Sequence, residues 1–596
     1  MKNRGLRKED QYTALSSLLF VAKLFMRIKP SKVITECVLF SVNQIFVVIN
    51  SVWLLECLAD MIFARKTFSD TVKVLAIVVS MNMAVRIVQH FYHYCVKPQK
   101  DLEIKQYLEK YLMEHAEALP LSCYEDSTFY TIVKQAQSAM SDTMFDAYSD
   151  LIRTGGNVAA LVSAVLAAAA INEGLLFFII FTIPMVLISR KYGRLLSDKK
   201  MRLTFWDRKK QYAKDTWMSK ELAGVFRITN AWRIADRHYE EGYQGSMEIH
   251  RAFSRSLSGW NLLGTEVSIT LIMFGCYLYG ILASVYAGSL SVSGFPVLFV
   301  AVMNMISRIR KLYGFYENFC GYGVQLKALR EFAALEPEAK KQEGLIPESF
   351  RTLEFCHVWF AYHGENWILK DVSFRIEAGE KISILGYNGA GKSTLIRLLL
   401  RFYTANRGEI LYNGVNIERY RLAEYRKMFS AVFQDYRLFS LTLAENLCMQ
   451  ACPVEKEQAV KEFLLQMGQR DLAADTGRIL GREYDGEGVV LSGGRQQWIT
   501  IARLYFAHFE IAVLDEPSAA LDPITARQMQ EDIVRFTGDR TLLLISHDMS
   551  VTKHVDRILF FDRGELAAQG THAALMRENQ NYAWFYECQA QNYRGV

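Results

Sequence analysis

The sequence lacks closely paired cysteines of the kind that build metal or disulfide centres. Its ten cysteines are scattered along 596 residues. The two nearest, Cys448 and Cys452, are spaced as in no metal or redox motif. We therefore expect buried or free thiols in a reducing compartment, and no structural role for metal–cysteine chemistry.

A strong charge imbalance is also absent. The formal net charge is +6, which is mild for this length, and no basic stripe indicates a nucleic-acid partner. No cleavable signal peptide is recognisable either. The first residues, MKNRGLRKEDQ, are polar, and the first apolar segment is too long for a signal-peptide core.

Long apolar segments crowd the first half of the chain and are absent from the second. Mean hydropathy is only +0.05, so a membrane part joined to a soluble part fits better than an all-membrane protein. A span needs about 20 apolar residues, and three of the segments reach that length only with their polar or small flanks. We expect six helical spans, near 33–58, 71–96, 155–171, 175–188, 260–287 and 295–306.

The distribution of Lys and Arg predicts the orientation of these spans. Basic residues precede the first span and fill the long connections near 97–150 and 190–257, whereas the short turns after the third and fifth spans have none. Positive residues mark the cytoplasmic side, although Arg65 and Lys66 in the first outer turn fit less well. We expect a multi-pass plasma-membrane protein with both termini in the cytoplasm. The helical periodicity of the long connections predicts that the spans extend into the cytoplasm.

The composition and the hydrophobic pattern of the sequence change after the last apolar segment. Pro337 and Pro347 lie in a charged run and mark a linker. From about 350, short β-branched strands alternate with helices, which is typical of α/β layers. We therefore divide the chain into a membrane domain over 1–335, a linker over 336–350 and an α/β domain over 351–596.

A phosphate-binding loop lies early in the α/β domain. The segment KISILGYNGAGKSTLIRLLL contains Gly386-x-x-x-x-Gly391-Lys392-Ser393 between an apolar strand and an apolar helix. In this context, glycines let backbone N–H groups surround phosphates. Lys392 would reach the outer phosphates, and the Ser393 hydroxyl would bind Mg²⁺.

Three further apolar strands end in polar residues suited to the same chemistry. Asp515 is placed to hold a Mg²⁺-bound water, and Glu516 to polarise the attacking water. His547 ends another strand, where it would hold phosphate and water, although a lone histidine is more often structural. Gln434 follows a further strand and suits Mg²⁺ ligation, with a plain polar strand end as the alternative. Tyr362 lies upstream of the phosphate-binding loop. Its ring would either stack on an adenine ring or pack against neighbouring side chains.

A second anion site is indicated by the turn in VVLSGGRQQW. Ser492, Gly493 and Gly494 run directly into a helical pattern. Such a turn presents free backbone N–H groups at a helix N-terminus, which favours phosphate.

These motifs, in this order, resemble the nucleotide-binding domain of ABC transporters, an α/β P-loop ATPase of RecA-like fold. With six spans ahead of them, the chain resembles a half-transporter of the exporter type (type IV). The resemblance implies that Tyr362 stacks on adenine, Glu516 is the catalytic base and His547 is the switch histidine. It implies Mg²⁺ ligation by Ser393, Gln434 and Asp515. The implied ATP-contacting residues are Tyr362, Gly386, Asn388, Gly389, Gly391, Lys392, Ser393, Thr394, Ser492, Gly493, Gly494 and Asp522.

The resemblance also implies an obligatory dimer. In this family the Ser-Gly-Gly turn closes over ATP held by a second half-transporter, so one chain supplies half of each site. The segments 122–128 and 220–227 resemble the coupling helices, and 483–488 resembles the loop that touches them. Arg495, Trp498 and Asp548 depart from the usual pattern. Arg495 is either a solvated helix-surface charge or the mark of a heterodimer with one altered site.

We expect ATP-driven export of a small molecule, lipid or peptide by alternating access. Import of a metal chelate or cofactor is the alternative, and a non-transporting channel or regulator is disfavoured by the intact Glu516 and His547. The short stretch before the first span argues against a leader-trimming protease domain. Candidate substrate-binding residues within the spans are Asn43, Gln44, Arg86, Glu266 and Asn304. Hydrogen bonding between helices is the alternative for the amides, and Glu266 would suit a cationic or polar substrate.

Overall fold

A computed structural model describes the chain except for residues 1–13, 64–67, 172–181, 221, 268–269, 271–274, 276–293, 339–343, 483–485, 518–520, 522, 547–551, 553 and 595–596. Its contacts divide it into two compact units. Unit 1 comprises 1–117 and 126–335, and unit 2 comprises 118–125 and 336–596. The short segment 118–125 thus packs with the C-terminal part of the chain, although it lies between two helices of unit 1.

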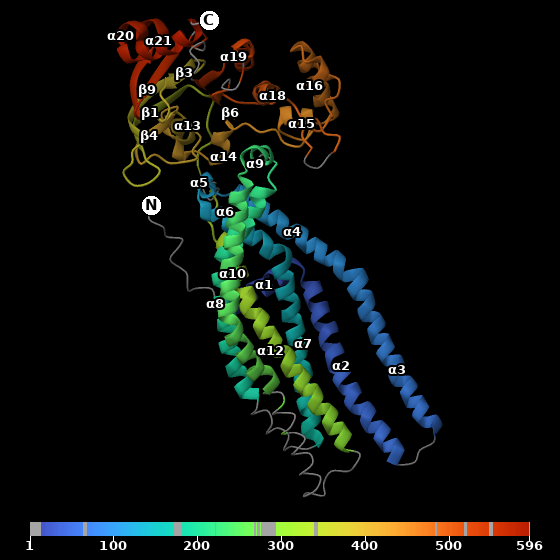
Figure 1. Cartoon of the computed structure of the whole chain (residues 1–596). Coiled ribbons are helices and arrows are strands. Elements are labelled where there is room, and N and C mark those ends of the chain that lie inside the picture. The colour runs from blue at the N-terminus through green and yellow to red at the C-terminus, as the bar shows by residue number, and fades with distance from the viewer. Residues whose placement is uncertain are drawn as a thin grey trace. The chain divides into compact units, whose positions relative to one another are not determined.

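Unit 1 consists of helices joined by short turns in its described residues (Figure 1). The long connections of the sequence are helical as well, and one helix, α8, runs without a break from 182 to 217. Single π-helical turns, Tyr92–Val96, Ala139–Thr143 and Leu262–Val267, interrupt three of the long helices. The helices are α1 (Ala14–Ile28), α2 (Pro30–Phe63), α3 (Phe68–Phe91), α4 (Lys97–Glu117), α6 (Ser127–Ser138), α7 (Met144–Ile171), α8 (Thr182–Trp217), α9 (Ala223–Thr229), α10 (Trp232–Asn261) and α12 (Gly294–Ala333).

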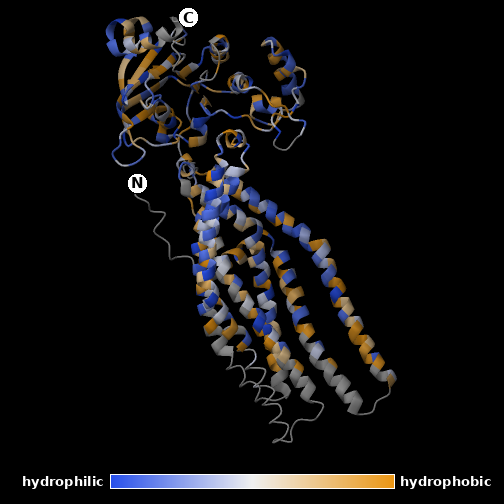
Figure 2. Ribbon diagram, viewed as in Figure 1, coloured by the Kyte–Doolittle hydropathy of each residue, from blue (hydrophilic) through white to orange (hydrophobic). Residues whose placement is uncertain are grey.

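The apolar segments occupy these helices only in part, as the colouring of Figure 2 shows. Within the described residues one helical stretch, Val72–Glu117, is long and apolar enough to cross a membrane. Ile77, Met83 and Ile87 on α3 are more than half exposed, as expected of a surface facing lipid or another subunit. Half of the fourth apolar segment and most of the fifth lie outside the described residues. The count of six spans therefore remains a prediction.

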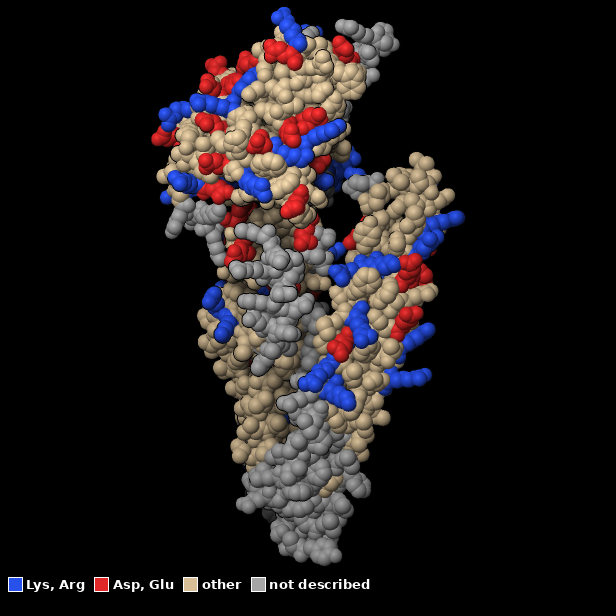
Figure 3. Space-filling model, turned by 90° about the vertical axis from the view of Figure 1, so that its left-hand side faces the viewer, with Lys and Arg blue, Asp and Glu red and all other residues tan. Residues whose placement is uncertain are grey.

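Charged side chains are unevenly spread over unit 1. On the face drawn in Figure 3, Lys, Arg, Asp and Glu gather over one part of the helices and are sparse over the adjoining part. Small residues bring the helices close together. A β-carbon at Gly156 of α7 would lie 2.3 Å from Phe40 of α2, and one at Gly245 of α10 would lie 2.4 Å from Trp206 of α8. Small residues of this kind allow neighbouring helices to approach closely.

Unit 2 consists of two sheets with helices around them. The first sheet is antiparallel, in the order β2-β1-β4-β5, and the second has the order β10-β9-β3-β8-β7-β6. In the second sheet all strands are parallel except β10, which pairs antiparallel with β9. The strands are β1 (Thr352–Phe360), β2 (Leu369–Glu377), β3 (Lys381–Gly386), β4 (Arg407–Tyr412), β5 (Val415–Asn416), β6 (Phe429–Val432), β7 (Ile511–Asp515), β8 (Thr541–Ile545), β9 (Arg557–Asp562) and β10 (Glu565–Gly570).

The parallel strands explain how distant motifs reach one place. β3, β7 and β8 are fully buried apart from Lys381, as near-continuous apolar runs predict. Because parallel strands share one carboxyl edge, the segments that follow β3, β6, β7 and β8 emerge side by side. The helices of unit 2 are α5 (Leu121–Tyr124), α13 (Lys392–Leu399), α14 (Leu422–Arg426), α15 (Leu443–Cys448), α16 (Val454–Gln466), α17 (Arg470–Ala473), α18 (Gly493–Phe506), α19 (Pro523–Thr537), α20 (His572–Glu578) and α21 (Gln580–Arg594).

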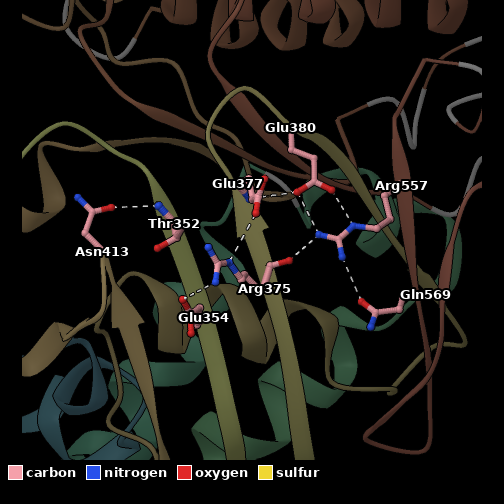
Figure 4. Close-up of polar contacts among 8 residues, drawn as sticks. All are labelled: Thr352, Glu354, Arg375, Glu377, Glu380, Asn413, Arg557 and Gln569. Carbon is pink, nitrogen blue, oxygen red and sulfur yellow. Dashed lines mark hydrogen bonds and ion pairs between the residues drawn. The ribbon is translucent and has the colours of Figure 1, made fainter.

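Arg557 ties the two sheets together (Figure 4). Its guanidinium donates to both carboxylate oxygens of Glu380, at 2.7 and 3.0 Å, and to the backbone carbonyl of Arg375 on β2. It also reaches Gln569 on β10 at 3.2 Å. Charge-assisted bidentate pairs of this kind fix the relative orientation of the two side chains as well as adding energy. Arg557 therefore holds β2 of the antiparallel sheet against β9 of the sheet that carries the site.

Candidate active site

The phosphate-binding loop follows β3 and leads into α13. Gly391 precedes α13 with a φ of 94°, and a β-carbon there would lie 2.6 Å from the Leu369 side chain, so only glycine fits. Lys392 is buried, and its Nζ donates to the carbonyl oxygens of Gly386 at 2.9 Å and Tyr387 at 3.0 Å. Burial lowers the pKa of Lys392 from its ordinary value. The ammonium group thus sits inside the loop, where phosphate oxygens can replace the two carbonyls.

Asp515, at the end of β7, supplies a buried carboxylate opposite the loop. It is 7% exposed, and its Oδ1 has no hydrogen-bond partner in the part of the chain that the structure describes. Burial raises the pKa of Asp515, and a hydrogen bond from Ser393 opposes that shift. A carboxylate oxygen beside a serine hydroxyl offers the hard oxygen ligands that Mg²⁺ prefers. The arrangement fits the expected metal site.

Glu516 is held in an uncommon backbone conformation. Its φ is 51°, in the left-handed region, and its N–H donates to the Ile545 carbonyl on β8 at 2.9 Å. The Glu516 Oε2 accepts a hydrogen bond from Gln434 Nε2 at 3.1 Å. Strained residues of this kind cluster at functional sites. The structure thus brings together Gln434 and Glu516, which lie 82 positions apart.

Tyr362 belongs to a polar network that the sequence did not reveal. Its hydroxyl lies 3.2 Å from Thr394 Oγ1 and accepts from Arg397 at 3.1 Å. Its ring meets Tyr403 edge-on, with centroids 5.1 Å apart. Both Arg397 and Tyr403 also contact the carboxylate of Glu125, which follows α5, with Arg397 at 2.9 Å. No motif marks Arg397, Tyr403 or Glu125, because their importance lies in these long-range contacts.

The Ser-Gly-Gly turn begins α18. Ser492 has an extended conformation, and its side chain forms no capping hydrogen bond. Ser492 and Gly493 are exposed. Gly494 packs closely, since a β-carbon there would lie 3.2 Å from Leu521. The first N–H groups of α18 therefore face outward without a side-chain cap, as an anion site at a helix N-terminus requires.

The unusual residues after this turn have specific partners. Arg495 forms an ion pair with Asp471, and its hydrogen bond holds the pKa of that carboxyl below its ordinary value. Trp498 donates from Nε1 to Asp532 Oδ2 at 3.0 Å and stacks on Phe463. Arg495 is thus a half-exposed helix-surface charge with a local partner, and Trp498 joins α18 to α19.

We expect Trp498→Phe to destabilise unit 2 by about 1–3 kcal/mol, because it leaves the buried Asp532 carboxylate without its donor. The urea concentration at which ATP binding is half lost should fall. Tyr505→Phe is the matched control, since Tyr505 is half exposed on the same helix and also stacks on Phe463. An equal shift in both variants would contradict the role of the hydrogen bond.

Several expected site residues lie outside the described residues. These are His547 and Asp522, together with residues 483–485. Asn388 and Gly389 are exposed on the phosphate-binding loop. The roles of all these residues stay predictions.

Two of the polar residues predicted for substrate binding have hydrogen-bond partners within unit 1. Gln44 accepts a hydrogen bond from Arg308, and Asn304 donates to Ser51 at 2.8 Å. These bonds join α12 to α2 and match the inter-helix alternative for the two amides. These hydrogen bonds do not test whether Gln44 or Asn304 contacts a substrate.

The other three candidates are differently placed. Glu266 is 60% exposed and pairs with Arg310 at 3.6 Å. Asn43 and Arg86 both line a cavity of about 1350 Å³ between α2 and α3. Most of the lining of this cavity is apolar, with Asn50, Asn82 and Glu36 among its polar residues.

The comparisons with known proteins agree with this geometry. Residues 369–519 match the family model described as ABC transporter. Over nearly the whole length, the fold matches a bacterial Atm1-family ABC exporter solved with ATP bound, with a TM-score of 0.80, 20% identity and coverage of 94% of this chain and 98% of that one. The chain therefore has the fold of an exporter-type half-transporter and carries an ABC transporter domain, which implies ATP binding. The resemblance inferred from the motifs is confirmed.

Two similar curated proteins are bacterial flippases of the same name. An ATP-dependent lipid A-core flippase of Haemophilus influenzae (strain 86-028NP) is 33% identical over 306 residues, covering 50% of this chain and 51% of the relative. The chain thus spans about half the length of that relative. A flippase of the same name from Legionella pneumophila (strain Paris) is 27% identical over 537 residues, covering 87% of this chain and 88% of the relative.

Proposed function

We propose that this protein is one half of a dimeric ABC transporter of the cytoplasmic membrane that exports a small molecule, lipid or peptide at the expense of ATP. The observation that carries the proposal is the meeting of Lys392, Asp515 and the Gln434–Glu516 pair at one edge of the parallel sheet. The same unit presents an exposed Ser-Gly-Gly turn at the start of α18. The names of the similar flippases and the exporter fold support export rather than import.

ATP binding is assigned to the residues around the phosphate-binding loop. Lys392 exchanges its contacts with Gly386 and Tyr387 for phosphate oxygens, and backbone N–H groups of the loop hold the remainder. Tyr362, held by Thr394 and Arg397, offers its partly buried ring to the adenine.

Hydrolysis is assigned to Glu516 as general base. Its carboxylate orients and polarises the attacking water, and Gln434, which follows the neighbouring strand β6, fixes the position of that carboxylate. We assign Mg²⁺ binding to Ser393, Gln434 and Asp515. When bound, Mg²⁺ neutralises charge on the outer phosphates. His547 is proposed to hold phosphate and water in the closed state.

The exposed Ser492–Gly494 turn is proposed to bind the phosphates of ATP held by the partner. A second half-transporter, identical or different, is then required for activity. Arg495 lies one residue beyond this turn, and its ion pair with Asp471 satisfies its charge locally. This ion pair favours the interpretation of Arg495 as a helix-surface charge over its interpretation as the mark of a heterodimer with one altered ATP site.

The direction of transport is tested with inside-out vesicles. An exporter takes up its substrate into such vesicles when ATP is added outside, whereas an importer of a metal chelate or cofactor does not. ATP-dependent loss of preloaded substrate from these vesicles would support the import alternative instead.

We expect Glu125→Gln to raise the KM for ATP on the order of two- to fivefold and to leave kcat unchanged, because an exposed ion pair contributes about 0.2–1 kcal/mol. The variant removes the charge that holds Arg397 against Tyr362. Steady-state ATP hydrolysis measures both constants. Glu348→Gln, which removes an exposed pair with Arg351 elsewhere in unit 2, should change neither. A fall in kcat at constant KM for Glu125→Gln would contradict this positioning role.

A further inference from the structure

Two cysteine side chains meet at the end of α15. Cys448 is the last residue of this helix, and Cys452 lies in the turn that joins α15 to α16 (Figure 1). The thiol of Cys452 donates a hydrogen bond to the Cys448 sulfur, with the two sulfur atoms 4.0 Å apart. Both side chains are partly buried, and both thiols are free. Because the spacing of the two residues matches no redox motif, the conformation of the chain between them must explain the contact.

An uncommon backbone conformation brings the two thiols together. Met449, which follows Cys448, has a φ of 52° in the left-handed region, where a residue with a long side chain is rarely found. Its N–H donates to the Glu445 carbonyl at 2.8 Å and closes the last turn of α15. The Met449 side chain is 53% exposed, so its burial does not compensate the strain. Strained residues cluster at functional sites, and here the strained turn returns the chain so that Cys452 contacts Cys448.

The two sulfur atoms are close enough to form a bond after a small movement. A disulfide bond is about 2.05 Å long, so the sulfur atoms must approach each other by about 2 Å. Rotation about the Cα–Cβ bonds supplies part of this approach, and the remainder falls on residues 449–451 and on the end of α15. Formation of a disulfide would therefore shift the end of α15.

The surroundings of Cys448 keep its thiol protonated. Burial raises the pKa of Cys448 to about 11, and the neighbouring Cys452 adds to this shift, whereas Lys456 opposes it. The thiolate is the nucleophile in disulfide exchange, so Cys448 is a poor first attacker at neutral pH. It is instead placed to displace a group already bound to Cys452.

The end of α15 is connected to both parts of the ATP chemistry. Asn446, two positions before Cys448, is fully buried. Its side-chain oxygen accepts from the Phe439 N–H at 3.0 Å, and its side-chain amide donates to the Phe439 carbonyl at 2.9 Å. Phe439 lies five residues after Gln434. The Asn446 carbonyl accepts from Arg503 Nε at 2.9 Å, and Arg503 lies on α18, which begins at the Ser-Gly-Gly turn. A shift of α15 would thus reach the segments that carry Gln434 and the turn.

The simpler interpretation is that both cysteines only fill space. They pack against an apolar cluster that includes Leu447, Val460 and Ile499, and free cysteines often serve as small apolar residues. Packing accounts for the partial burial of each sulfur atom. It requires neither the contact between the two sulfur atoms nor the strain at Met449 that produces it, and the two interpretations differ in the response to an oxidant.

We propose that Cys448 and Cys452 form a redox site whose disulfide form lowers ATP hydrolysis. The Cys452 thiolate attacks a small disulfide, RSSR, which leaves a mixed disulfide on Cys452 and releases RS⁻. The Cys448 sulfur then attacks the Cys452 sulfur, so that the intrachain disulfide forms and a second RS⁻ leaves. The two thiol protons pass to the two released thiolates, and the two electrons lost by the cysteines reduce RSSR. In a reducing compartment the pair stays reduced until small disulfides accumulate.

The test oxidises the full chain, assembled with its partner in lipid nanodiscs, with glutathione disulfide. Remaining thiols are blocked with N-ethylmaleimide. Mass spectrometry then identifies the disulfide in the peptide that contains both cysteines by the loss of two hydrogen atoms and the absence of the maleimide. ATP hydrolysis should fall on the order of tenfold, since a displacement of about 1 Å far from the chemistry can cost ~10²-fold, and dithiothreitol should restore it. Failure of the disulfide to form, or its formation at an unchanged rate of hydrolysis, would overturn the proposal.

Cys448→Ala and Cys452→Ala each remove one sulfur atom and should abolish the response to glutathione disulfide, while the untreated rate stays close to that of the wild type. Either variant suffices if the other does not fold. Cys356→Ala is the matched control, because Cys356 is also a partly buried cysteine of unit 2, on β1, and it should respond as the wild type does. A response that persists without Cys448 or Cys452, or that disappears without Cys356, would assign the effect to another thiol and overturn the proposal.

The regulatory effect rests on the proposed ATP hydrolysis, whereas formation of the disulfide does not. Absence of hydrolysis from the reduced wild type would contradict the transport function and the regulation together, and the peptide mass would still show whether the disulfide forms. Normal hydrolysis that glutathione disulfide does not change would contradict the regulation alone.

Discussion

Replacing Glu516 by glutamine should lower ATP hydrolysis on the order of 10²- to 10⁴-fold, the usual contribution of a general base. The amide cannot accept the proton of the attacking water, whereas its shape still fits beside Gln434. ATP affinity should stay close to that of the wild type, because Lys392 and the phosphate-binding loop are untouched. Single-turnover hydrolysis and equilibrium binding of a fluorescent ATP analogue, both on the purified full chain with its partner, measure the two effects.

Glu510→Gln is the matched control for this prediction. Glu510 immediately precedes β7, whereas Glu516 immediately follows it, so the two substitutions alter the same strand at opposite ends. The control should hydrolyse ATP normally. Hydrolysis by Glu516→Gln within a few-fold of the wild type would show that another group is the base.

The motifs that carry ATP chemistry were predictable because their spacing is local. The phosphate-binding loop needs its glycines, Lys392 and Ser393 within one turn, and the structure places them there between β3 and α13. The meeting of Asp515, Glu516 and Gln434 was also predictable in outline. Each follows an apolar strand, and parallel strands share one carboxyl edge.

Contacts between distant segments could not be predicted in the same way. Arg397 and Glu125 are 272 positions apart, and nothing in the local sequence of either residue indicates the other. Trp498 was recognised as unusual, but its partner Asp532 lies on a different helix, 34 positions away. Such pairs depend on how the helices pack, which periodicity alone does not determine.

The candidate substrate-binding residues show the same limit within unit 1. The amides Gln44 and Asn304 were recognised because polar residues inside apolar runs are conspicuous. Arg308 lies just beyond the last apolar run and was not singled out. It is nevertheless the residue that Gln44 contacts. A cation just beyond the last apolar run, followed by Arg310 and Lys311, was the available signal, and only the packing of α2, α7 and α12 shows that Arg308 is buried.

Two inactive variants of this chain should restore activity to each other when mixed. Lys392→Ala disables the phosphate-binding loop and leaves the Ser-Gly-Gly turn intact, whereas Gly493→Asp places a negative charge at the exposed start of α18 and leaves the loop intact. If each ATP lies between the loop of one chain and the turn of its partner, a mixed dimer contains one site built from two intact halves. A site formed within a single chain would be defective in every molecule of the mixture.

The expected rate after random mixing of equal amounts is about a quarter of the wild-type rate, because half of the dimers are mixed and each has one working site of two. Each variant alone should be inactive, and a mixture of Lys392→Ala with Glu516→Gln should stay inactive, since both changes fall on the same half. ATP hydrolysis measured after co-refolding into lipid, or after co-expression with distinct affinity tags, tests this. Recovery only when a different half-transporter is added would show that the partner is not a second copy of this chain, and the Arg495–Asp471 pair would then lie beside the turn that faces that partner's nucleotide.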